Sequence, residues 1–213
     1  MIFKDRIDSA TRLAEKLDWL KKENPIVLAI PRGGVVTGDV LARLLSAELD
    51  IIVSRKIGAP NNSELAIGSV AHDGTFFPNS SLISTLKVPM DYIESKKNSE
   101  VKEIKRRLAI FRGNKDYELN GKTVVLVDDG IATGATMISA INWVKKQKPR
   151  RIIVAVPVAP KEIVEKIDTL DEVYVLNRPT FFNSVGEFYD SFEQVEDNQV
   201  IEIMKRNGFL RKD

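Results

Sequence analysis

The sequence predicts an α/β fold with a mostly parallel sheet. Short apolar runs rich in β-branched residues alternate with longer stretches in which apolar residues recur at helical spacing. Polar residues and glycines follow several of the runs directly, before the next helical pattern begins. This order implies right-handed crossovers, with the polar residues gathered at the carboxyl edge of the sheet. The five runs are 26–30, 49–53, 124–127, 151–157 and 172–176.

The composition excludes several classes of protein. With 213 residues, of which 43% are hydrophobic and 29% charged, the chain can form one domain with a large core. A formal net charge of +2 argues against a general nucleic-acid binder. The absence of cysteine excludes disulfides, thiol nucleophiles and cysteine-ligated zinc. The single histidine, His72, excludes multi-histidine metal sites and any Ser-His-Asp triad that does not use it.

Sequence features also suggest where the protein resides. No apolar run approaches the roughly 20 residues that a membrane span needs. The first residues, Met-Ile-Phe-Lys-Asp-Arg, are charged too early for a signal peptide. We therefore expect a cytoplasmic protein with no membrane segment, forming a single domain over residues 1–213 with its core at about 26–176.

Helices are predicted between the strands. The longest covers 89–112, and its basic residues are interleaved with glutamates, so a solvated face is favoured over nucleic-acid binding. Residues 65–77 predict a β-hairpin that turns at Asp73-Gly74. The remaining predicted helices are 5–22, 35–45, 137–148, 161–167 and 197–207, the last of them capped by Asp197.

The most informative stretch is 124–136. Asp128 and Asp129 place two carboxylates at a strand's carboxyl end, where ligands bind in open α/β sheets. A loop of small residues then opens a helix, whose free N–H groups form an anion site. Together they would fit a phosphorylated sugar, and an ordinary turn capped by one acid is the alternative. The loop residues are Gly130, Ile131, Ala132, Thr133, Gly134, Ala135 and Thr136.

This stretch resembles the phosphoribosyl pyrophosphate (PRPP) motif of the type I phosphoribosyltransferases, in which an apolar strand, two acids and two or three variable residues precede Thr-Gly-x-Thr. The resemblance covers roughly residues 26–176. It implies that family's fold: a mostly parallel, five-stranded twisted sheet flanked by helices, with a small hood over its carboxyl edge. Residues 177–197 would form the hood with the N- or C-terminal helices. A homodimer is expected at the level of the family.

The resemblance also implies a role for each polar group of the motif. The N–H groups of 131–136 and the hydroxyls of Thr133 and Thr136 would hold the 5′-phosphate of PRPP. Asp128 and Asp129 would accept hydrogen bonds from the ribose hydroxyls and stabilise positive charge on the ribose as pyrophosphate leaves. Mg²⁺ is expected to arrive with PRPP, contacting these carboxylates through water or ribose rather than as direct ligands.

A second candidate loop follows strand 26–30. It reads Pro31-Arg32-Gly33-Gly34 and resembles the family's loop that holds the pyrophosphate. Gly33 and Gly34 permit backbone shapes that other residues avoid, and Arg32 can form two parallel bonds to a phosphate. A tight turn with a solvent-exposed arginine is the alternative.

Two further cations, Arg55 and Lys56, follow strand 49–53. They precede a Gly/Pro/Asn loop that extends to Glu64, which suggests an anion clamp with a mobile lid. The pair resembles the adenine phosphoribosyltransferases, whose neighbouring loop closes over the leaving pyrophosphate, so both are predicted to be catalytic along with the two acids. A solvated basic pair is the alternative. Glu64 is a weak acid–base candidate, and His72 is expected to be exposed or structurally bonded.

The acceptor is not identified by the sequence. Some purine enzymes of the family carry an acid where this chain has Ala132, which counts against hypoxanthine or guanine chemistry. Ala132-Thr133-Gly134 is closer to the adenine and uracil enzymes, but 177–197 resembles neither of their hoods. Phe181 or Phe182 could stack on a flat base, or these aromatics could fill a small core.

We therefore predict a PRPP-dependent phosphoribosyltransferase. It would transfer 5-phosphoribose to a nitrogen of an unidentified small-molecule acceptor, a nucleobase or related compound, and release pyrophosphate. The alternative is a PRPP-binding regulator on the same fold without transferase activity, although no nucleic-acid module is evident. A sugar-phosphate-binding or structural relative that has lost catalysis is the third hypothesis.

Overall fold

The structure is a computed structural model that describes residues 1–113, 116–168 and 172–210, apart from the side chains of Glu64 and Asp168. In that part of the chain the main sheet has five parallel strands in the order β2-β1-β6-β7-β8. The predicted α/β fold with a parallel sheet is thereby confirmed. The strands are β1 (Ile26–Ala29), β2 (Glu48–Ile51), β6 (Thr123–Val127), β7 (Arg151–Val158) and β8 (Glu172–Asn177).

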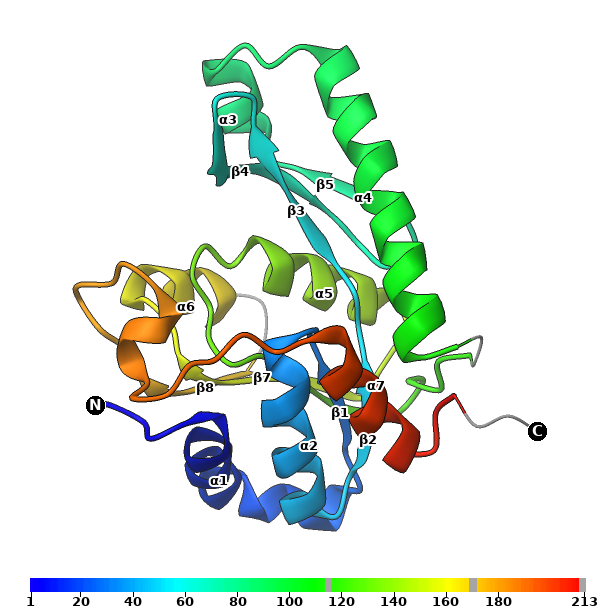
Figure 1. The fold of residues 1–213 in the computed structure, drawn as a ribbon, viewed down its shortest axis with the longest axis vertical. Helices are drawn as coiled ribbons and strands as arrows, with labels where there is room; N and C mark the ends of the chain where they lie inside the picture. Colours follow the sequence, from blue (N-terminus) through cyan, green and yellow to red (C-terminus); the bar gives the residue numbers. More distant parts are fainter. Residues whose placement is uncertain (114–115, 169–171, 211–213) are drawn as a thin grey trace.

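Helices cover both faces of this sheet (Figure 1). Val125 and Val127 of the central strand pack with residues of the helices on one face, whereas Val124 and Leu126 pack with those on the other. Successive side chains of a strand point to opposite faces of the sheet, which explains this alternation. Because helices cover both faces, both sets of side chains are buried, and β6 is apolar from Val124 to Val127. The helices are α1 (Arg6–Lys16) and α2 (Gly33–Leu45) on the first face, and α5 (Ala135–Lys146) and α6 (Lys161–Asp168) on the second.

A second, antiparallel sheet extends away from the main sheet together with two helices (Figure 1). The predicted hairpin at Asp73-Gly74 and the predicted helix 89–112 are both present. The Gly/Pro/Asn stretch that extends to Glu64, predicted as a loop, forms the end of one strand, a turn at 60–61 and the start of the next strand. Ile57 and Ala59 alternate inward, which favours a strand. The elements are β3 (Arg55–Ala59), β4 (Asn62–Val70), β5 (Phe76–Pro78), α3 (Ser80–Thr85) and α4 (Met90–Phe111).

The two ends of the chain differ in detail from the prediction. The first helix ends at Lys16, and a 3₁₀ helix, η1 (Asp18–Glu23), follows it. Near the other end, η2 (Val185–Phe188) precedes α7 (Asp197–Arg206), whose cap is Glu196 in a capping box rather than the predicted Asp197. None of the helices in the described ranges is long and apolar enough to cross a membrane.

Candidate active site

The loop after β6 leads directly into α5 at the carboxyl edge of the sheet. Gly134, which precedes the first residue of α5, has a φ of 78°, a conformation that favours glycine. A helix start leaves the N–H groups of its first turn without intrahelical partners, so Ala135, Thr136 and Met137 can donate to an anion. Ile131 behaves differently from the prediction. Its N–H donates to the carbonyl of Val158 at 2.9 Å, so this group anchors the loop to β7 and is not available to a phosphate.

A cavity of about 220 Å³, the phosphate cavity, lies against this loop. It brings Lys56, at the start of the second sheet, together with Asp128 and the small residues that follow it. The sequence predicted these groups in two separate stretches, and the fold joins them. The cavity is lined by Lys56, Asp128, Gly130, Ile131, Ala132, Thr133, Gly134, Thr136 and Met137.

The two glycines after β1 lie against the two acids after β6. A Cβ on Gly33 would overlap the carboxylate of Asp129, and a Cβ on Gly34 would lie 2.9 Å from the Cα of Asp128. Both glycines form the first turn of α2, which therefore begins two residues earlier than predicted. Only glycine allows the start of α2 to approach the acids so closely. The pyrophosphate-type loop and the PRPP-type loop are thus adjacent.

The two acids have different electrostatic environments. The N–H of Asp129 donates to Asp128 Oδ1 at 2.8 Å. Burial, and then the neighbouring carboxylate of Asp129, raise the pKa of Asp128 well above its ordinary value. Asp129 is compensated by a cation, since Arg6 Nε lies 2.7 Å from its Oδ2. One carboxylate is therefore paired, and the other faces the phosphate cavity.

Arg6 is the site residue that sequence reasoning missed. Its guanidinium carbon lies 3.9 Å from the centroid of the Phe192 ring, and its NH1 donates to the Glu193 carbonyl at 2.8 Å. Tyr189 Oη donates to the backbone carbonyl of Asp129 at 2.6 Å. Segment 177–197 and the first helix therefore fix the second acid from two sides. In the sequence, Arg6 looks like any charged residue on the outer face of an amphipathic helix.

The other two predicted clamp residues face carboxylates of the protein. Arg32 NH1 lies 3.3 Å from Asp197 Oδ1 in α7, and Arg55 Nε lies 2.7 Å from Glu100 Oε2 in α4. Their side chains are 28% and 37% exposed. The structure therefore brings Lys56 alone of the three predicted cations into the wall of the phosphate cavity.

The two phenylalanines proposed to stack on a base differ in exposure. Phe181 is 91% exposed, whereas Phe182 stacks on Phe188 with ring centroids 5.6 Å apart. Phe182 also lines a larger groove next to the phosphate cavity, together with Thr180. The side chain of Glu64, the acid–base candidate, lies outside the described part of the structure.

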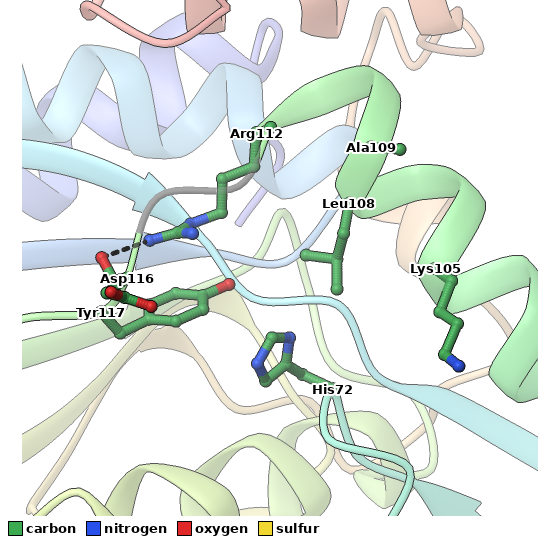
Figure 2. Close-up of a pocket in the computed structure, with 8 residues that line it drawn as sticks. His72, Lys105, Leu108, Ala109, Arg112, Asp116 and Tyr117 are labelled. Atoms are coloured by element: carbon green, nitrogen blue, oxygen red, sulfur yellow. Dashed lines mark hydrogen bonds between the residues drawn. The ribbon is translucent and has the colours of Figure 1, made fainter.

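His72 belongs to a separate pocket of about 430 Å³ near the end of α4 (Figure 2). Its ring makes edge contacts with Tyr117 and Trp143, and burial lowers its pKa, so it is neutral at neutral pH. Arg112 covers the Tyr117 ring at 3.6 Å and forms two hydrogen bonds, of 2.8 and 2.9 Å, to Asp50. These contacts are structural, and His72 lies outside the phosphate cavity.

The acids suit a magnesium ion that is shared with a substrate. In the described ranges no three acidic or histidine side chains are grouped to hold a metal. Mg²⁺ is commonly bound by one or two carboxylates with substrate phosphates supplying the remaining oxygens. Because Arg6 already pairs with Asp129, the adjacent acids Asp128 and Asp129 fit a contact with such an ion through water or ribose.

Comparisons with known proteins give the same assignment. The family model described as "Phosphoribosyl transferase domain" matches residues 2–192. "Putative phosphoribosyl transferase Rv0571c" of Mycobacterium tuberculosis H37Rv is 35% identical over 207 residues, which are 96% of this chain and 47% of the relative. Its counterpart in strain CDC 1551, MT0597, gives the same values. The chain spans about half the length of these curated relatives.

A solved structure matches nearly the whole chain. The crystal structure of TT1426 from Thermus thermophilus has a TM-score of 0.81 and 39% identity, covering 97% of this chain and 99% of that one. The fold and the loop at its edge define the class: an α/β protein in which a loop of small residues opens a helix where the central strand ends. With the family match, the chain belongs to the phosphoribosyltransferase family and has the type I phosphoribosyltransferase fold.

Proposed function

We propose that the chain transfers 5-phosphoribose from PRPP to a nitrogen of a small-molecule acceptor and releases pyrophosphate. The observation that carries this proposal is the phosphate cavity, which unites Lys56, Asp128 and the α5 start in one site. The helix start and the Thr133 and Thr136 hydroxyls bind the 5′-phosphate. Asp128 and Asp129 accept hydrogen bonds from the ribose hydroxyls.

In the proposed reaction the acceptor nitrogen attacks C1 of the ribose. The bond between C1 and the pyrophosphate oxygen breaks, and its electron pair leaves with pyrophosphate. The two carboxylates stabilise the positive charge that develops on the ribose, and Lys56 stabilises the negative charge on the leaving group. Mg²⁺ bound with PRPP would neutralise further phosphate charge, and Asp128 and Asp129 would contact it through water or ribose.

Arg32 and Arg55 would join the leaving-group site by exchanging partners. Each is partly exposed and bound to a carboxylate of α7 or α4. Such pairs contribute only about 0–1 kcal/mol, whereas a hydrogen bond to a charged group contributes about 1.5–3 kcal/mol. Pyrophosphate can therefore compete for both arginines.

The same ion pairs also support a second candidate function, a PRPP-binding regulator without transferase activity. If Arg32 and Arg55 stay on Asp197 and Glu100, the leaving group lacks two of its three predicted cations. PRPP would then bind without turnover. The homodimer, the single-domain boundaries and the cytoplasmic location stay predictions from the sequence.

Pyrophosphate release from PRPP and Mg²⁺ tests the proposal. The panel of acceptors contains purines, pyrimidines, small amides and amines, and benzimidazoles with and without a phenyl group, with Asp128→Asn/Asp129→Asn as the inactive control. Release that requires one acceptor and disappears in the control would support the transferase. PRPP binding without release for any acceptor would favour the regulator.

A further inference from the structure

A groove of about 920 Å³ adjoins the phosphate cavity. The second sheet and α3 form one side, α5 and α6 form another, and Thr180 and Phe182 of segment 177–197 complete the wall. We call it the lateral groove. Its volume is at the upper end of the roughly 300–1,000 Å³ that drug-sized ligands occupy, whereas the phosphate cavity has about 220 Å³. The phosphate cavity therefore suits the sugar phosphate, and the groove offers room for a larger molecule.

The groove and the phosphate cavity are continuous. Ala132 and Thr133 line both of them. Lys56 lines the cavity and Ser69 lines the groove, and these two residues are direct partners in the antiparallel pairing of β3 and β4. Cross-strand partners point to the same face of a sheet, so the groove begins beside the lysine that meets the leaving group. A molecule in the groove thus lies next to the proposed reaction centre.

The lining of the groove selects for a neutral, apolar body. Apolar side chains from all sides face it, including Leu65, Phe77, Ile138 and Phe182. Among the described lining residues, the charged side chains are one acid and one base on the same helix, Glu162 and Lys166. This arrangement provides no excess of cations for an anionic acceptor, and large apolar walls reward burial of apolar surface.

We propose, on the basis of the proposed function, that the acceptor is a neutral nitrogen compound whose apolar or aromatic body is larger than a nucleobase. Its nitrogen lies at the end of the lateral groove that Ala132 and Thr133 share with the phosphate cavity, on the side of C1 opposite the leaving pyrophosphate. Its body lies between Phe77 on one side and Ile138 and Phe182 on the other. The nitrogen lone pair forms the new bond to C1, the bond to pyrophosphate breaks, and the proton on nitrogen passes to water.

Calorimetry with matched probes tests this proposal. Benzimidazole, 5-phenylbenzimidazole and benzimidazole-5-carboxylate share one nitrogen heterocycle and differ in body size or charge. They are titrated into the protein saturated with ribose 5-phosphate and Mg²⁺. We expect the phenyl compound to bind at least about tenfold more tightly than benzimidazole, and the carboxylate to bind more weakly than benzimidazole. Equal affinities, or a preference for the carboxylate, would overturn the proposal.

Two neighbouring phenylalanines provide a matched pair of variants. Phe182→Ala removes a groove wall and should abolish most of the gain from the phenyl group, whereas Phe181→Ala, which changes a 91% exposed side chain, should keep it. Thr180→Trp adds bulk from an exposed position and should exclude the phenyl compound while benzimidazole still binds. If the phenyl compound still binds more tightly than benzimidazole to both Phe182→Ala and Thr180→Trp, the ligand binds outside the lateral groove.

Ribose 5-phosphate binding separates the two levels of the account. If ribose 5-phosphate binds but the phenyl compound has the same affinity as benzimidazole, the groove assignment fails and the proposed transferase stands. If ribose 5-phosphate does not bind the wild type at all, the proposed function fails and the groove assignment fails with it. Analytical ultracentrifugation of the same proteins adds one check. If Phe182→Ala dissociates an oligomer while the probe affinities stay unchanged, the groove is an interface between copies of the chain, and the proposal is overturned.

Discussion

Arg6 Nε lies 2.7 Å from Asp129 Oδ2, although the two residues are 123 positions apart. The contact joins the first helix to the second acid of the PRPP motif. Phe192 stacks on the same guanidinium, and Tyr189 holds the backbone of the acid. Two separate stretches of the chain, the first helix and segment 177–197, therefore determine where one carboxylate points.

Replacement of Arg6 tests the importance of this contact. Arg6→Met leaves the Asp129 carboxylate without its partner and its fixed orientation, so kcat/KM for PRPP should fall by about tenfold or more. Arg12→Met is the matched control, since Arg12 pairs with Asp8 in the same helix at an exposed position. Steady-state kinetics on both variants provide the comparison. Tighter PRPP binding by Arg6→Met would mean that Arg6 competes with the ribose hydroxyls and does not position the acid.

Lys56 is the predicted cation that lines the phosphate cavity, so its loss should be the most costly of the three. Lys56→Met should lower kcat by about 100-fold, the magnitude found when one charge-stabilising donor is removed. Arg55→Met serves as the comparison, because Arg55 contacts Glu100 of α4. Pyrophosphate-release assays measure both. An Arg55 effect that exceeds the Lys56 effect would show that the clamp rearranges more extensively than proposed.

Gly34→Ala should damage both the fold and the site. The added Cβ would lie 2.9 Å from the Cα of Asp128. Neither the backbone at the start of α2 nor the backbone at Asp128 can easily move to relieve the overlap. Overpacking of this kind costs about 1–3 kcal/mol. Urea denaturation should show this loss, and ribose 5-phosphate affinity should decrease with it. Unchanged stability and affinity would contradict the close approach of the two loops.

The pKa of Asp128 predicts a pH-dependent stability. Because burial raises the pKa of this acid in the folded state, folding favours its protonated form, and the charged form opposes folding. The penalty is absent below the unfolded pKa of about 3.9 and grows as pH rises toward the folded pKa. Asp128→Asn should therefore raise the free energy of unfolding at pH 7, in the absence of ligands, and the gain should vanish near pH 3. Urea denaturation of the wild type and the variant at pH 7 and pH 3 measures the change in the free energy of unfolding. Asp5→Asn, which makes the same replacement at a helix N-cap, is the control. A gain of the same size at both values would exclude ionisation as its cause.

The sequence predicts contiguous features well and long-range contacts poorly. The strand and loop at 124–136 and the helix near 89–112 follow from local periodicity and turn chemistry, and the structure confirms those elements. The pairing of Arg6 with Asp129 and of Arg32 with Asp197 depends on tertiary packing, which no local pattern contains. Residues 54–64 contain a Gly/Pro/Asn signal that favoured a loop, but the strands absorb Gly58 at an irregularity in their pairing.

The most direct test of the central claim is calorimetric titration of PRPP with Mg²⁺ into the wild type and into Asp128→Asn/Asp129→Asn. The account predicts that the wild type binds PRPP and that the variant binds at least about 100-fold more weakly while staying folded by circular dichroism. Absence of PRPP binding by the wild type, or equal binding by the variant, would contradict the assignment of this loop as the PRPP site.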